Sequence, residues 1–98
     1  EFVEYPDLVV NLTNYSVLYK GHSVDMPPKE LELLYFLASS PNQVFTREQL
    51  LDRIWGYDFA GNSRTVDTHV KTLRQKLGSE GQWIVTLIRS GYKFEVRL

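Results

Sequence analysis

The sequence contains no cysteine, so neither disulfides nor a zinc–thiolate cluster can hold the fold together. This absence is compatible with a reducing compartment, and we expect the protein to be cytoplasmic. The longest apolar run, residues 33–38, is far shorter than the roughly 20 residues that span a bilayer. No signal peptide is visible either, so we expect no membrane partner.

The sequence also has few of the residues that catalysis or metal binding requires. His22 and His69 lie far apart in the chain and form no helical pair, so we expect no metal site. Asp52 and Asp58 do not accompany a nucleophile, and residues 56–61 lack the Gly-Lys-Ser/Thr pattern of a phosphate-binding loop. These absences predict a protein that is not an enzyme and that carries no cofactor.

The 98 residues, 43% hydrophobic and 23% charged, are enough for one small globular domain covering residues 1–98. The formal charge is −1, but it is unevenly distributed. Residues 1–63 hold four Lys/Arg against nine Asp/Glu, whereas residues 64–98 hold seven against three. A basic half in a slightly acidic chain points to a polyanion-binding end, although charge also varies by chance between segments of a chain.

Three short segments rich in Val, Leu and Tyr open the chain at residues 8–10, 16–19 and 22–26, with turn residues between them. This spacing predicts an antiparallel meander. Pro27 and Pro28 then begin a helix that reaches Ala38, because proline suits the first helical position. The apolar residues of this helix cover a broad stripe, so we expect it to be mostly buried.

A second helix is predicted from Thr46 to about Trp55, because Thr46 can cap it while Gln49 reaches back. A connection follows at residues 56–63, in which Tyr57 and Phe59 either form a partner surface or fold back on the domain. Ser63 is the expected cap of a third helix, residues 64–77. A final hairpin pairs residues 83–88 with residues 92–98, where Tyr92, Phe94, Val96 and Leu98 alternate with charged residues. The order predicts an α+β winged helix-turn-helix fold.

The third helix has two contrasting faces on a 100°-per-residue wheel. Val66, Val70, Leu73 and Leu77 form one narrow stripe that we expect to dock on the core. The opposite face carries Arg64, Thr68, Lys71 and Gln75, with Thr72 beside them; Asp67 and Arg74 flank one side, and Thr65, His69 and Lys76 flank the other.

This outward face suits a DNA major groove, because threonine is short and can contact a base edge or a thymine methyl group. Lys71 and Gln75 can reach guanine or adenine edges, while arginines and lysines at the flanks can contact phosphates. Arg89 lies at the glycine-containing turn of the hairpin, where it can approach a minor groove. Two alternatives remain: an ordinary solvated helix, and a winged-helix module for protein–protein contact.

Three stretches resemble the DNA-binding domains of OmpR/PhoB-family bacterial response regulators. They are residues 27–56, RTVDTHVKTLRQKL at 64–77 and TLIRSGYKF at 86–94, and the resemblance covers nearly the whole chain. It implies a four-stranded N-terminal sheet, three helices and a C-terminal wing, with residues 64–77 as the recognition helix.

The resemblance also implies that Trp55, Arg64 and Tyr92 contact phosphate. It implies that Asp67, Thr68, Lys71 and Thr72 face bases. We add Gln75 to this base-facing set because the helical wheel places it on the same outward face. The full set expected at the DNA backbone or on the wing is Thr46, Arg47, Trp55, Arg64, Thr65, Arg74, Arg89 and Tyr92.

Several partners follow from the same resemblance. Family members bind direct repeats in double-stranded DNA as head-to-tail homodimers, and the loop with Tyr57, Asp58 and Phe59 is expected to contact RNA polymerase. A sensor histidine kinase acts on a receiver domain that this sequence does not include. Two wing positions depart from the family pattern, since Ile88 stands at the usual arginine and Arg89 at the usual glycine. Thr72 likewise stands where many members carry arginine.

Overall fold

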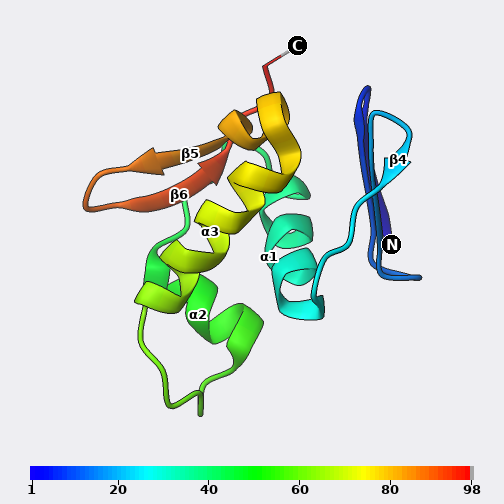
Figure 1. The fold of residues 1–98 in the computed structure, drawn as a ribbon. Coiled ribbons are helices and arrows are strands. Elements are labelled where there is room, and N and C mark those ends of the chain that lie inside the picture. The colour runs from blue at the N-terminus through cyan, green and yellow to red at the C-terminus, as the bar shows by residue number, and fades with distance from the viewer. Residues whose placement is uncertain (98) are drawn as a thin grey trace.

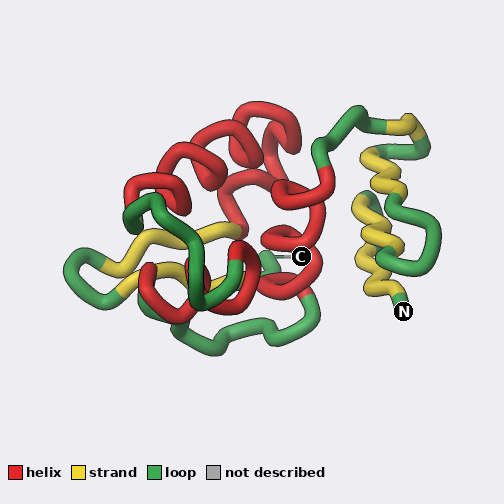
Figure 2. Tube along the Cα trace, turned by 90° about the horizontal axis from the view of Figure 1, so that it is seen from below, coloured by secondary structure: helices red, strands yellow, loops and turns green. Residues whose placement is uncertain are grey.

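The computed structural model describes residues 1–97 and places a sheet, three helices and a hairpin side by side (Figure 1). The outer layers are the four-stranded sheet and the hairpin, and the helices lie between them (Figure 2). The elements in chain order are β1 (Phe2–Tyr5), β2 (Leu8–Asn11), β3 (Ser16–Tyr19), β4 (His22–Ser23), α1 (Pro28–Ala38), α2 (Arg47–Trp55), α3 (Arg64–Leu77), η1 (Gly78–Trp83), β5 (Ile84–Leu87) and β6 (Gly91–Phe94).

The N-terminal sheet is an antiparallel meander in the order β1-β2-β3-β4. Leu8 and Val10 of β2 and Val17 of β3 are fully buried against the helices, while alternate residues face outward. The four strands confirm the expected sheet. The last predicted strand is too long, however, because β4 ends at Ser23 and the chain then turns toward Pro27.

Helix α1 begins as its prolines predict. Pro27 precedes the helix with φ −59° and ψ 152°, Pro28 occupies the first turn, and no side chain caps the start. Leu31, Leu33, Leu34, Leu37 and Ala38 are buried, and Tyr5 donates a hydrogen bond of 2.7 Å to the Ala38 carbonyl. This bond joins β1 to the C-terminal end of α1.

Helix α2 has the capping box that its sequence predicts. The Gln49 amide donates to Thr46 Oγ1 at 3.0 Å, and the Thr46 amide donates to Gln49 Oε1 at 2.8 Å. Both bonds satisfy backbone donors that a helix leaves unpaired at its start. The capped end fixes where α2 begins, directly beside the hairpin.

Helix α3 buries Val66, Val70, Leu73 and Leu77, so the expected inward stripe is confirmed. The expected cap is wrong. Ser63 already has helical angles, φ −64° and ψ −14°, and its side chain makes no capping bond. Asn62 takes that role, because its Oδ1 accepts from the Arg64 amide at 2.9 Å.

The C-terminal hairpin starts one residue later than predicted. Residues 78–83 form a 3₁₀ helix, so the first strand begins at Ile84 rather than Trp83, and Ile88 lies in the turn. Tyr92 and Phe94 are buried and Val96 is half-buried; Leu98 lies outside the described residues. No helix in residues 1–97 is long and apolar enough to cross a membrane.

The base of the hairpin is joined to the segment before α2. The Phe45 amide donates to the Tyr92 carbonyl, and the Tyr92 amide donates to the Phe45 carbonyl, both at 2.9 Å. Gly91, with φ +123°, makes this approach possible. The hairpin is therefore anchored to the helices on one side and extends beyond them on the other (Figure 1).

Candidate nucleic-acid interface

The outward face of α3 is free of contacts with the core. Arg64, Thr68, Lys71 and Gln75 are all exposed, as the wheel predicts, and they recur along one side of the helix. Thr72 is half-buried and donates from Oγ1 to the Thr68 carbonyl at 3.2 Å. The helix thus presents short and long polar side chains together on one surface.

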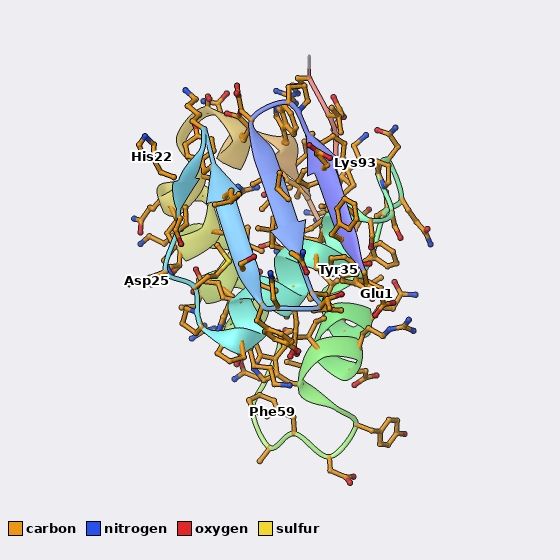
Figure 3. All side chains as sticks on the ribbon, turned by 90° about the vertical axis from the view of Figure 1, so that its right-hand side faces the viewer. Glu1, His22, Asp25, Tyr35, Phe59 and Lys93 are labelled. Carbon is orange, nitrogen blue, oxygen red and sulfur yellow. The ribbon has the colours of Figure 1, made fainter. Side chains whose placement is uncertain are left out.

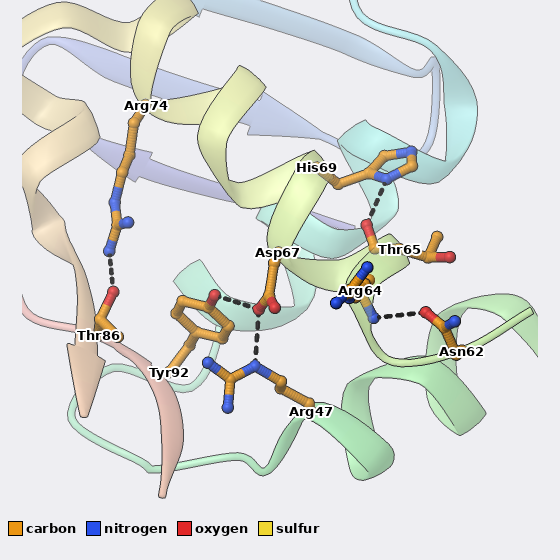
Figure 4. A network of polar contacts seen from close by, with 9 residues as sticks. All are labelled: Arg47, Asn62, Arg64, Thr65, Asp67, His69, Arg74, Thr86 and Tyr92. Carbon is orange, nitrogen blue, oxygen red and sulfur yellow. Dashed lines mark hydrogen bonds and ion pairs between the residues drawn. The ribbon is translucent and has the colours of Figure 1, made fainter. Parts of the chain in front are cut away.

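One flank of this face is an interacting group of three residues from three elements (Figure 4). Asp67 Oδ1 accepts from Arg47 Nε of α2 at 2.7 Å and from the Tyr92 hydroxyl of β6 at 2.5 Å. The Arg47 guanidinium also lies 5.5 Å from the centre of the Tyr92 ring. Asp67 therefore links the two elements that border α3.

Burial, hydrogen bonds and charge shift the pKa values of all three residues, and those of Asp67 and Tyr92 decide their protonation states. Burial would raise the pKa of Asp67, but the hydrogen bonds from Tyr92 and from Arg47 outweigh it and hold that pKa below its ordinary value. Burial raises the pKa of the Tyr92 hydroxyl, and its bond to the Asp67 carboxylate raises it further. At neutral pH Asp67 is therefore ionised and Tyr92 is a neutral donor.

Arg74 attaches the hairpin to α3. Its Nη2 donates to the Ile84 carbonyl at 2.6 Å and to Thr86 Oγ1 at 2.7 Å, and its Nε also reaches the Ile84 carbonyl at 3.1 Å. The sequence predicts a phosphate contact for Arg74, and that remains a prediction. In this structure the guanidinium holds the first strand of the hairpin against the helix.

The other flank is aromatic. Trp55, at the end of α2, lies 4.8 Å from His69 and 6.2 Å from Phe59, measured between ring centres. His69 Nδ1 lies 2.8 Å from the Thr65 carbonyl. The sequence leaves two alternatives for the aromatic residues of the 56–63 loop. Phe59 packs near Trp55, as expected if it folds back on the domain. Tyr57 is 90% exposed, as expected for a partner surface.

The remaining residues of the expected set occupy separate places. Thr46 is exposed at the start of α2 and is engaged by its capping bond. Arg89 is exposed in the hairpin turn. Phe59 lies on the loop that extends below the helices, away from the N-terminal sheet (Figure 3). Asp58 belongs to the same loop and is exposed.

The surface formed by α3, the start of α2 and the hairpin is strongly cationic. Arg47, Arg64, Lys71, Arg74 and Arg89 lie on or beside it, and Asp67 is the acidic side chain that α3 adds. Glu48 adds a second, exposed carboxylate in the first turn of α2. Glu30 of α1 pairs with Lys76, whose Nζ lies 3.0 Å from Glu30 Oε1. The excess of basic residues in the C-terminal half of the sequence therefore gathers largely on this one surface.

Sequence reasoning missed two residues that shape this surface. The capping role of Asn62 could have been predicted from the sequence, because asparagine ranks among the preferred capping residues. Thr86, which orients Arg74, gives no local signal, since its partner lies on another element. Within residues 1–97, no group of His, Asp and Glu side chains could hold a metal ion.

Replacing Asp67 with asparagine should lower the stability of the domain at neutral pH. The carboxylate is 40% exposed and water screens its ion pair, so we expect a loss of only about 0.5–1 kcal/mol. Because the pKa of Asp67 is lowered by folding, its contribution is fully present above the ordinary value of 3.8 and is lost as pH falls through the folded value. Urea unfolding of both proteins between about pH 3 and pH 7 would test this. A difference that stays constant down to the lowest pH would contradict it.

Comparison with known proteins agrees with this arrangement. Residues 21–94 match the family described as "Transcriptional regulatory protein, C terminal". The transcriptional regulatory protein SrrA of Staphylococcus aureus is 45% identical over 101 residues, which is 99% of this chain and 42% of SrrA. The chain thus spans less than half the length of this relative.

Solved structures share both sequence and fold. The response regulator DrrB, an OmpR/PhoB homologue from Thermotoga maritima, is 33% identical with a TM-score of 0.86, over 97% of this chain and 44% of DrrB. The RstA DNA-binding domain of Klebsiella pneumoniae, solved in complex with the RstA box, is 28% identical with a TM-score of 0.82, over 97% of both chains. The chain therefore belongs to the family of C-terminal domains of transcriptional regulatory proteins, with the winged-helix fold of OmpR/PhoB response regulators.

Proposed function

We propose that the chain binds double-stranded DNA in a sequence-specific manner, as the output domain of a two-component response regulator that controls transcription. The observation that carries this proposal is the outward face of α3, where Arg64, Thr68, Lys71 and Gln75 are all exposed. The RstA domain, which has the same fold, was solved with DNA.

The size and chemistry of this face fit a major groove about 12 Å wide. Thr68 is short and lets the helix approach, while Lys71 and Gln75 can reach base edges. Arg64 at the start of the helix, Arg47 on α2 and Arg89 on the hairpin are placed to contact phosphates on either side. The helix N-terminus adds a favourable partial charge for phosphate.

Asp67 can also serve as a base reader. Its bonds to Arg47 and Tyr92 both use Oδ1, and within residues 1–97 Oδ2 forms no hydrogen bond. An aspartate oxygen can accept from the amino group of cytosine in the major groove. The two bonds at Oδ1 would hold the carboxylate in a fixed orientation for that contact.

A protein–protein module is the weaker alternative. Protein interfaces centre on a desolvated apolar or aromatic cluster. The described outward face of α3 has no such cluster, and its exposed side chains are charged or polar. We likewise propose no catalytic role, because no nucleophile accompanies a base on this surface.

The wider protein follows from the family. We propose that a receiver domain, phosphorylated through a sensor histidine kinase, controls this domain, and that two copies bind direct repeats head to tail in the cytoplasm. A single domain should then bind weakly, and linked copies should bind tightly through a high effective concentration. We further propose Tyr57, Asp58 and Phe59 as the contact to RNA polymerase, supported by the exposure of Tyr57.

An amide NMR titration tests the DNA-binding proposal directly. A duplex enriched from a random-sequence library by this chain would be added at two salt concentrations. We expect shifts in residues 64–77 and 86–93 that shrink at high salt, because phosphate contacts release counterions. Shifts confined to residues 57–59, or none at all, would favour the protein-interaction alternative.

Replacing Arg89 with glycine should have opposite effects on stability and binding. Arg89 has φ +67°, a conformation that glycine adopts without strain. We expect stability to rise by about 0.5–1 kcal/mol and DNA binding to weaken, because a cation is removed. Urea unfolding and fluorescence anisotropy measure the two effects. Arg89→Ala is the control, since it removes the charge but keeps the strain; if Arg89→Gly binds as tightly as the unmodified chain, the wing contact is wrong.

A further inference from the structure

Ile88 is an unusual side chain for the place it occupies. It lies in the turn between β5 and β6 and is 84% exposed, more than any other large aliphatic side chain in residues 1–97. Single exposed apolar residues are common on protein surfaces, so exposure alone is not informative. Ile88 differs from such residues in where it is held and in what surrounds it.

The turn breaks local preferences at two successive positions. Turns favour Gly, Asn, Asp and Ser, whereas Ile88 is β-branched and Arg89 adopts a positive φ of 67°. The turn is nevertheless well formed, since the Ser90 amide donates to the Leu87 carbonyl at 2.8 Å. Residues that oppose local preference on a surface indicate function.

The tip is held on a rigid base. The backbone pair between Phe45 and Tyr92 fixes β6, and Arg74 fixes β5 through Thr86 and the Ile84 carbonyl. The free end of the hairpin extends away from the helices (Figure 1). Ile88 is therefore presented at the end of a braced strand pair, where little of its position depends on a flexible loop.

The chemistry around the tip suits a polyanion. Residues 81–94 contain no acidic residue. Lys93 pairs with Glu95, with 3.0 Å between Nζ and Oε2, so Arg89 supplies the positive charge at the tip. Ser90 and Thr86 are exposed polar neighbours of Ile88. A protein-binding anchor would be surrounded by further apolar side chains. An apolar point with a cation beside it instead matches the apolar wedges that enter a DNA minor groove and unstack one base step.

We propose that Ile88 is such a wedge: it inserts between two base pairs from the minor groove and bends the duplex, while Arg89 contacts the adjacent backbone. This inference rests on the proposed DNA binding and assigns a separate role to the wing. It predicts specificity at the deformed step, because flexible pyrimidine–purine steps unstack most readily.

The test uses the full chain and the duplex that it enriches from a random-sequence library. 2-Aminopurine, whose fluorescence rises when it is unstacked, replaces adenine at successive positions beside the sequence that α3 contacts. Energy transfer between dyes at the duplex ends reports bending. Ile88→Ala is compared with Ile88→Leu, which keeps an apolar wedge, and with Leu18→Ala, which truncates an exposed leucine on β3.

We expect fluorescence to rise at one step and the duplex ends to approach each other with the unmodified chain, Ile88→Leu and Leu18→Ala. Ile88→Ala should abolish both signals and weaken binding roughly fivefold. Unchanged signals with Ile88→Ala would overturn the wedge and leave DNA binding intact. Weaker binding without any unstacking signal would also overturn it, and would assign Ile88 to a surface contact or to a second copy of the chain. If no duplex is enriched, the proposed function and the wedge both fail.

Discussion

Replacing Gly91 with alanine is expected to destabilise the domain by about 3–5 kcal/mol. A Cβ atom at this position would lie 1.9 Å from the Phe45 carbonyl oxygen and 2.9 Å from Thr46 Cα, both of them backbone atoms. The φ of +123° adds strain for any residue with a side chain. To relieve the clash, the chain must break the backbone pair between Phe45 and Tyr92 and move the capped start of α2.

Urea unfolding followed by tryptophan fluorescence would measure this loss, which is a large part of the roughly 5–15 kcal/mol that stabilises a typical domain. Gly21→Ala is the matched control. Gly21 also has a positive φ, +80°, but no atom lies within 4 Å of its Cβ position, so it should lose only about 1 kcal/mol. Equal losses for the two variants would show that backbone strain, and not the hairpin junction, sets the effect.

Replacing Lys71 with alanine is expected to weaken binding to the enriched duplex by about 1–3 kcal/mol. Lys71 lies in the middle of the outward face of α3 and is exposed, so its removal should leave stability nearly unchanged. The expected loss reflects a contact to a base edge, and it should therefore be much smaller on a duplex of scrambled sequence.

Fluorescence anisotropy on both duplexes separates the two kinds of contact. An equal loss on the enriched and the scrambled sequence would assign Lys71 to a phosphate contact. The slope of log K against log salt concentration should then become less steep by about 0.9, the value for one phosphate contact. Lys20→Ala is the control, because it removes the same charge at the exposed turn after β3. A loss of similar size for Lys20→Ala would point to a general charge effect.

The sequence predicts the helices of this domain well because their signals are local. Thr46 and Gln49 satisfy each other within one turn, and the stripe from Val66 to Leu77 repeats at helical spacing. Short elements are harder. The 3₁₀ helix at residues 78–83 is too short to show a period, and the residue patterns alone missed β1, which the family resemblance supplied.

The candidate site was predictable as a surface but not as a set of contacts. The wheel places Arg64, Thr68, Lys71 and Gln75 outward, and the structure confirms their exposure. The wheel does not reveal that Asp67 binds Arg47 and Tyr92, because those partners come from other elements. Periodicity tells which side of a helix faces outward, while ion pairs between elements depend on how those elements pack.

The cap of α3 illustrates the same limit at short range. Ser63 and Asn62 are both residues that favour helix starts, so composition does not choose between them. The choice depends on the backbone angles of Ser63, which are already helical. The difference is one residue, and it leaves the bounds of α3 unchanged at Arg64–Leu77.

The separation of α3 into two independent faces has a consequence for how this domain can change over time. Its inward residues are fully buried, whereas Arg64, Thr68, Lys71 and Gln75 are solvent-exposed and contribute little packing. Substitutions at those four positions can accumulate without eroding the scaffold. A library randomised at these positions should therefore consist mostly of folded proteins. Under the base contacts proposed above, such a library would also contain domains that bind new DNA sequences.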